Sequence, residues 1–129
     1  MMRAIDTNVL VRILIKDDEN QSKKALKYVK KHGEVFISLI VLCETIWVCK
    51  DCYDLNKDEI IQVINHILRT DQFIVDYSEV VWSALSEYKR VSIDFADCLI
   101  GAIAKFHSYL PVGTFDKKAK KSEYFEHIS

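Results

Sequence analysis

The stretch Ala4-Ile5-Asp6-Thr7-Asn8-Val9-Leu10 decides the fold. A short apolar run leads to Asp6, two small polar residues follow it, and a second apolar run begins at Val9. This order predicts a strand, a tight turn and a helix, because Thr7 and Asn8 suit a turn and can accept hydrogen bonds from first-turn N–H groups. Asp6 then lies at the carboxyl end of the strand, the edge at which open α/β sheets bind ligands. The alternative interpretation is that Asp6 only caps the helix.

Size and composition predict one globular domain over residues 1–129. Half of the residues are apolar, 29% are charged, and the chain holds only one Pro and three Gly. The formal net charge of −1 argues against strong non-specific binding of nucleic acid, although not against a local basic patch. No signal-peptide pattern opens the sequence, and the longest apolar region, residues 35–49, is too short for a membrane span. We therefore expect a cytoplasmic protein with no membrane partner.

Strand-like and helix-like patterns alternate along the rest of the chain. Short apolar runs predict strands at residues 35–37, 73–75 and 110–115, with an edge strand at 124–128. Helical periodicity predicts helices at residues 21–32, 39–53, 57–68, 79–88 and 95–108, and a short basic turn at 117–121. Such alternation implies an α/β fold with right-handed crossovers and a mostly parallel four- to five-stranded sheet covered on both faces.

Helix-boundary signals support these predictions. Gly33 can end one helix, and Ser38 and Ser78 can each cap another. Asn56 followed by Glu59 has the spacing of a capping box.

The cysteines are few and scattered at Cys43, Cys49, Cys52 and Cys98. The spacing of Cys49 and Cys52 can suggest zinc or a redox pair, but a zinc site would need two more soft ligands and no second close pair exists. Reduced, mostly buried thiols are the favoured interpretation.

Glu44 is the only charged side chain in residues 35–49. Its helix is apolar on nearly every side, which predicts burial or a subunit contact. A buried, unpaired carboxylate is costly, so Glu44 should meet a cation, be protonated or open onto a cleft. The alternative is a private ion pair in the core.

Three more acids lie at element boundaries. Asp94 and Asp97 share one face at the start of the helix at 95–108, and Asp116 follows the strand at 110–115. Asp94 could be only an N-cap and Asp116 only part of a turn. Taken with Asp6 and Glu44, however, these acids lie on segments that a parallel sheet brings to one edge.

Clustered carboxylates repel one another, and hard divalent cations are the ions that bind them well through oxygen alone. No His occurs in these stretches, so Mg²⁺ or Mn²⁺ is favoured over zinc. The chemistry that requires such a cluster is metal-assisted hydrolysis of phosphodiester bonds.

The whole chain resembles the PIN-domain nucleases, especially the VapC-type toxins of bacterial and archaeal toxin–antitoxin pairs. Four motifs in order carry the resemblance: residues 5–10 (IDTNVL), 38–44 (SLIVLCE), 94–100 (DFADCLI) and 114–116 (TFD). Any one motif is short and unspecific, whereas four at fitting spacings are a strong signal. The resemblance assigns the catalytic and metal-binding acids as Asp6, Glu44, Asp97 and Asp116, with Asp94 as a further candidate ligand. It assigns supporting roles to Thr7, Asn8 and Thr114.

The resemblance also implies a three-layer α/β/α sandwich and an endoribonuclease that uses Mg²⁺ or Mn²⁺. It implies a homodimer and a cognate antitoxin that inhibits by inserting into the acidic cleft. Candidate RNA contacts are Lys117, Lys118, Lys120, Lys121 and Arg12, although a solvated surface would explain the same charges.

Two other functions fit parts of the sequence. A haloacid-dehalogenase-like phosphatase also begins with a strand, an Asp and a turn, but it needs a second Asp where this chain has Asn8. A non-catalytic binding module could keep the fold and use the acids as caps and ion pairs.

Overall fold

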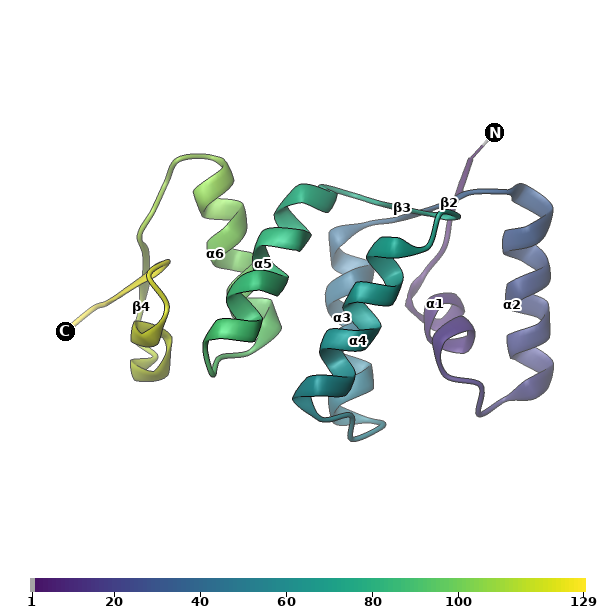
Figure 1. The fold of residues 1–129 in the computed structure, drawn as a ribbon, viewed down its shortest axis with the longest axis horizontal. Coiled ribbons are helices and arrows are strands. Elements are labelled where there is room, and N and C mark those ends of the chain that lie inside the picture. The colour runs from purple at the N-terminus through teal and green to yellow at the C-terminus, as the bar shows by residue number, and fades with distance from the viewer. Residues whose placement is uncertain (1) are drawn as a thin grey trace. The chain divides into compact units, whose positions relative to one another are not determined.

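The computed structural model describes residues 2–129. The chain forms two compact units, of which the first ends at Asp76 and the second begins at Tyr77 (Figure 1). The first unit contains β1 (Arg3–Ala4), α1 (Thr7–Leu14), α2 (Glu19–His32), β2 (Val35–Ile37), α3 (Leu39–Asp51), α4 (Lys57–Arg69) and β3 (Phe73–Val75). The second contains α5 (Ser78–Arg90), α6 (Phe95–Phe106), β4 (Val112–Thr114), the 3₁₀ helix η1 (Lys117–Lys121) and β5 (Phe125–His127).

The first unit is built on a parallel sheet with the strand order β1-β2-β3. The central strand β2 is its core, with Val35 and Ile37 fully buried. Because neighbouring parallel strands end at the same edge, the residues that follow β1 and β2 start side by side. Helix α1 follows Asp6 and helix α3 follows Ser38, so both helices begin at the same edge of the sheet.

In the second unit, α5 packs against α6, and β4 pairs in parallel with β5. Both strands are shorter than the predicted runs at 110–115 and 124–128. The predicted α/β class with parallel strands is confirmed, and within residues 2–129 the strands pair as one set of three and one set of two. None of the helices in this part of the chain has the length and hydropathy to cross a membrane.

Most of the predicted helix boundaries are confirmed. Ser38 accepts a hydrogen bond from the Val41 N–H at 3.2 Å, and Asn56 and Glu59 form both bonds of a capping box. Gly33 ends α2 with a φ of 81°, a left-handed conformation that favours glycine.

Two predicted helix starts were wrong, and the helices predicted to end at residues 53 and 108 end two residues earlier, at Asp51 and Phe106. Helix α2 begins at Glu19, two residues earlier than predicted, because the Asp18 carboxylate accepts a hydrogen bond from the Gln21 N–H at 3.1 Å. Ser78 is the first residue of α5 and not its cap. Tyr77 takes the cap position with a φ of 50° and without a capping side-chain hydrogen bond.

Gly101 on α6 lets the ring of Tyr124 approach the helix. A Cβ at residue 101 would lie 2.3 Å from Cδ2 of Tyr124, well inside contact distance. We expect Gly101→Ala to lower the free energy of unfolding by about 1–3 kcal/mol, because overpacking forces shifts of side chains or backbone. Urea denaturation measures the loss.

Gly113→Ala is the matched control, because its Cβ would meet only the tip of the flexible Ile128 side chain, at 3.1 Å. Equal losses in the two variants would show that the Tyr124 contact is not tight.

Candidate active site

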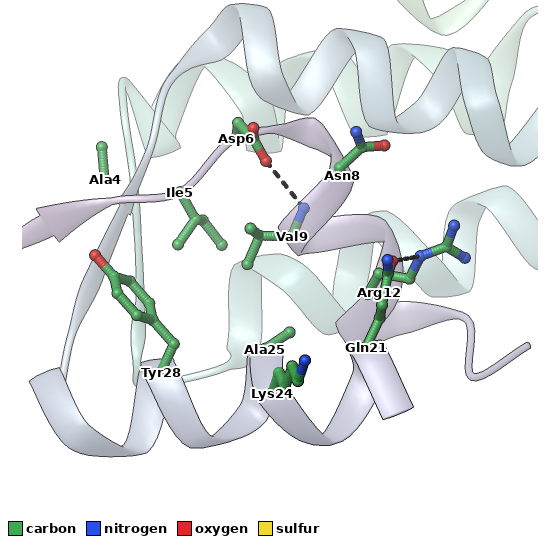
Figure 2. A pocket seen from close by; sticks show the side chains of 10 residues that line it. All are labelled: Ala4, Ile5, Asp6, Asn8, Val9, Arg12, Gln21, Lys24, Ala25 and Tyr28. Carbon is green, nitrogen blue, oxygen red and sulfur yellow. Dashed lines mark hydrogen bonds between the residues drawn. The ribbon is translucent and has the colours of Figure 1, made fainter. Parts of the chain in front are cut away.

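Asp6 follows β1 and caps α1. Its Oδ1 atom accepts a hydrogen bond from the Val9 N–H at 3.0 Å (Figure 2). The capping role that the sequence left open is therefore real, and it occupies one carboxylate oxygen. The side chain is exposed, so the capping bond leaves Asp6 accessible to a ligand at the sheet edge.

Thr7 joins Glu44 to the start of α1. The Thr7 hydroxyl donates a hydrogen bond to Glu44 Oε1 at 3.1 Å, across 37 residues of sequence. The parallel pairing of β1 with β2 explains this contact, because it starts α1 and α3 at the same edge. The first unit thus brings together Asp6, Thr7 and Glu44 at that edge.

Burial of α3 on all sides, one of the two expectations for this helix, was wrong, because Glu44 is exposed. Helix α3 buries the opposite side, with the residues Leu42, Thr45, Ile46 and Cys49. Its exposed face also carries Ile40 and Trp47, at 73% and 61% exposure. A helix that is apolar on all sides gives no periodic signal for which side is buried, so the sequence left the surroundings of Glu44 open.

A pocket of about 580 Å³ opens beside Asp6 (Figure 2). Its walls come from β1, α1 and α2, and the residues that line it are Ala4, Ile5, Asp6, Asn8, Val9, Arg12, Gln21, Lys24, Ala25 and Tyr28. The sequence predicted no role for Lys24 or Tyr28, because nothing within α2 indicates that these residues line a pocket beside Asp6. The pocket places one amino group and one aromatic ring within the same hollow as Asp6.

Arg12 is engaged within the protein. Its guanidinium donates hydrogen bonds to Asp17 at 2.7 Å and to Gln21 at 2.8 Å, and Tyr53 donates to Asp17 at 2.8 Å. The hydrogen bond from Tyr53 and the nearby Arg12 charge hold the pKa of Asp17 below its ordinary value, although burial opposes them. This network ties α1 to the end of α3 and gives Arg12 a structural role.

The second unit holds two further carboxylates, Asp94 and Asp116, whose charges act on Asp97. Burial raises the pKa of Asp97, and the negative charges of Asp94 and Asp116 raise it further. Asp94 takes the N-cap position of α6, but its side chain makes no capping hydrogen bond. A carboxylate that is desolvated and repelled in this way is a candidate for a functional site.

Asp116 is fixed by backbone hydrogen bonds at the end of β4. Its carboxylate accepts from the Lys118 N–H at 2.9 Å, and its own N–H donates to the Thr114 hydroxyl at 3.0 Å. The lysines Lys117, Lys118, Lys120 and Lys121 follow it and are all exposed. The turn therefore displays one acid next to a basic surface.

The candidate acids form two groups, Asp6 with Glu44 in the first unit and Asp94, Asp97 and Asp116 in the second. Within residues 2–129, no three His, Cys, Asp or Glu side chains are arranged closely enough to hold a metal ion. The donors are all carboxylate oxygens, the chemistry that suits Mg²⁺ or Mn²⁺. The chemistry of these donors therefore fits such an ion.

The cysteines are free, as the sequence predicted. Cys49 and Cys98 are buried, Cys43 is half-buried and Cys52 is exposed. Burial raises the pKa of the Cys43 and Cys49 thiols, and the nearby Glu44 adds to the shift of Cys43. Protonated thiols are poor metal ligands, which agrees with a structural role.

Comparison with known proteins identifies the family. A family model of the PIN domain matches residues 4–123, nearly the whole chain. The chain belongs to the PIN-domain family. It is also similar to a VapC ribonuclease from Aquifex aeolicus (strain VF5), with 25% identity over 123 residues that cover 93% of this chain and 91% of that protein. No solved structure matches the chain significantly.

Family membership agrees with the fold. The parallel strands and the helices between them are consistent with the three-layer α/β/α architecture expected of a PIN domain. The match spans all four acidic motifs that the sequence singled out, from Asp6 through Glu44 and Asp97 to Asp116.

Proposed function

We propose that this PIN-domain protein is a metal-dependent endoribonuclease and the toxin of a type II toxin–antitoxin system. The observation that carries the proposal is the setting of Asp97, which is partly buried and has the negative charges of Asp94 and Asp116 nearby, a setting that a bound cation would stabilise. The similarity to a VapC ribonuclease along 93% of the chain supports the choice of RNA as substrate.

We propose that Asp6, Glu44, Asp97 and Asp116 act in one site of a single domain and hold Mg²⁺ or Mn²⁺, with Asp94 as a further ligand. When bound, the metal activates a water molecule and stabilises the leaving oxygen of the phosphodiester. Thr7 orients the Glu44 carboxylate, and Thr114 holds the backbone of Asp116. Asn8, exposed beside Asp6 at the start of α1, supports the same edge.

The partners follow from the same proposal. The substrate is RNA, a cognate antitoxin covers the acidic site, and the protein acts in the cytoplasm as a homodimer. Lys117, Lys118, Lys120 and Lys121 contact phosphates next to Asp116, whereas Arg12 is left out because its guanidinium is bound within the protein.

The lysine contacts predict a change in salt dependence. In an Asp97→Asn background, which prevents cleavage, replacing Lys117 and Lys118 by Gln should weaken RNA binding. Log affinity falls with log salt, and each lost phosphate contact should make this slope less negative by about 0.7 for single-stranded RNA. Fluorescence anisotropy with labelled RNA measures the slope.

The matched control replaces Lys27 and Lys31 of α2, which are equally exposed, by Gln. Equal slopes in both double variants would mean that the η1 lysines are no more than solvated surface charges.

A non-catalytic PIN-fold binding module is the second candidate, because Asp6 and Asp116 do cap helices. Incubation of purified protein with single-stranded and structured RNA, with Mg²⁺, with Mn²⁺ or with a chelator, separates the two functions. We expect cleavage with either ion and none in chelator. Equal cleavage in chelator would refute the metal mechanism, and binding without cleavage of any RNA or DNA would favour the module.

A further inference from the structure

Glu87 on α5 is a buried acid that the proposed site does not use. It is 7% exposed, and it lies among the buried residues Val80, Val81, Ala84, Leu85 and Tyr88 of the same helix. Both of its carboxylate oxygens accept hydrogen bonds from the Arg90 guanidinium, between 2.8 and 3.1 Å. The Arg90 side chain is 53% exposed, so only the acid of this pair is buried. Burial of a carboxylate is costly, so we asked which other group Glu87 serves.

Glu87 also reaches beyond its own helix. Its Oε2 atom accepts a hydrogen bond from the hydroxyl of Ser122, which is 35 residues away in sequence and 1% exposed. The Ser122 hydroxyl oxygen in turn accepts from the Tyr124 N–H at 3.2 Å. Ser122 therefore connects α5 to the backbone that leads into β5.

Ser122 is the residue that ends η1, and Asp116 is the residue that caps its start. Only the five residues of η1 separate them, and Ala119 within η1 is buried. The segment is held at its start by Thr114 and at its end by Glu87 through Ser122. Tyr124, two residues later, packs on Gly101 of α6, the helix that carries Asp97.

We infer that Glu87 is a positioning residue: through Ser122 it fixes η1, and with it Asp116, against the α5–α6 pair that carries Asp97. The separation of the Asp97 and Asp116 carboxylates is then set by a hydrogen-bonded link in the core of the second unit. The anchoring of η1 stands on this geometry alone, and only its consequence for metal binding rests on the proposed function.

The test compares two variants that cut the link with one that only weakens the core. Ser122→Ala removes the hydroxyl and leaves the Glu87–Arg90 pair intact, and Glu87→Met keeps the length of the side chain but removes both acceptor oxygens. Leu85→Ala is the control, because Leu85 is 1% exposed on the same helix and is not part of the Glu87–Ser122 link. Its loss of packing lowers global stability.

Hydrogen exchange of the folded, metal-free proteins decides the anchoring. We expect the Lys118, Ser122 and Tyr124 amides to exchange at least tenfold faster in Ser122→Ala and Glu87→Met, with α5 and α6 amides changed far less. Leu85→Ala should instead speed exchange across the unit as a whole. Unchanged η1 amides in both link variants, or the same uniform pattern as in Leu85→Ala, would overturn the inference.

Titration with Mn²⁺ then measures the consequence for the proposed site. Affinity should fall by about 10- to 100-fold in either link variant, the loss typical for residues that orient metal ligands. The double variant should lose little more than either single one, because both substitutions cut the same link. Full Mn²⁺ affinity despite a loosened η1 would overturn the claim that the link sets the carboxylate separation. A wild-type protein that binds no Mn²⁺ would refute the proposed function and leave the exchange result to decide the anchoring.

Discussion

Asp97→Asn should abolish RNA cleavage while leaving the metal-free protein at least as stable as the wild type. The loss of rate should be at least about 10²–10³-fold, the size seen when one group that stabilises transition-state charge is removed. The stability result follows from the crowding of Asp94 and Asp116 around Asp97, because neutralising one of three like charges relieves their repulsion.

The stability gain should depend on pH in a defined direction. The folded protein raises the pKa of Asp97, through burial first and then through Asp94 and Asp116. An acid whose pKa is higher in the folded state favours folding while it is protonated. The contribution of Asp97 to stability is therefore complete below the ordinary pKa of 3.8 and is lost as the pH rises through the folded-state pKa. The gain of Asp97→Asn should therefore be present at neutral pH and absent below pH 3.8.

Thermal denaturation of the metal-free proteins across this pH range measures the gain, and a cleavage assay measures the rate. Asp71→Asn is the control, because Asp71 is an exposed turn residue outside the proposed site. If Asp97→Asn unfolds without metal while Asp71→Asn does not, Asp97 is a structural acid and its catalytic assignment fails.

Glu44→Gln should lower metal affinity and cleavage together and change the free energy of unfolding little. Glu44 is exposed and keeps one hydrogen bond, from the Thr7 hydroxyl, which a glutamine oxygen can still accept. The substitution therefore removes a negative charge and leaves the local contact in place. We expect a loss of cleavage of about 10²–10³-fold, as for removal of one preorganised charge.

Glu34→Gln provides the control for the loss of one exposed negative charge in the first unit. Calorimetric titration with Mn²⁺ and urea denaturation of both variants separate the two roles. Unchanged Mn²⁺ affinity in Glu44→Gln, with a large loss of stability, would make Glu44 a structural partner of Thr7.

Local signals explain the parts of this protein that its sequence predicted well. Ser38, Gly33 and the Asn56–Glu59 capping box act within three or four residues, and each ends or starts a helix where predicted. The strand at residues 73–75 was likewise predicted from its own three apolar residues.

The errors arise where tertiary structure decides. The apolar sequence of α3 has no periodicity, so nothing in it shows that Glu44 lies on the exposed face. Glu87 was missed because it interrupts an apolar stripe, and its partner Ser122 lies 35 residues away. The grounds for placing Asp6 and Asp97 in one site were the expected sheet topology and the family resemblance, and no local pattern of residues carries that information.

Calorimetric titration with Mn²⁺ of the wild type, Asp6→Asn and Asp97→Asn tests most directly whether acids of both units form one metal site. The proposed function predicts that the wild type binds Mn²⁺ and that each substitution, in a different unit, reduces the affinity by at least tenfold while both variants remain folded. Full affinity in either variant would contradict a shared site.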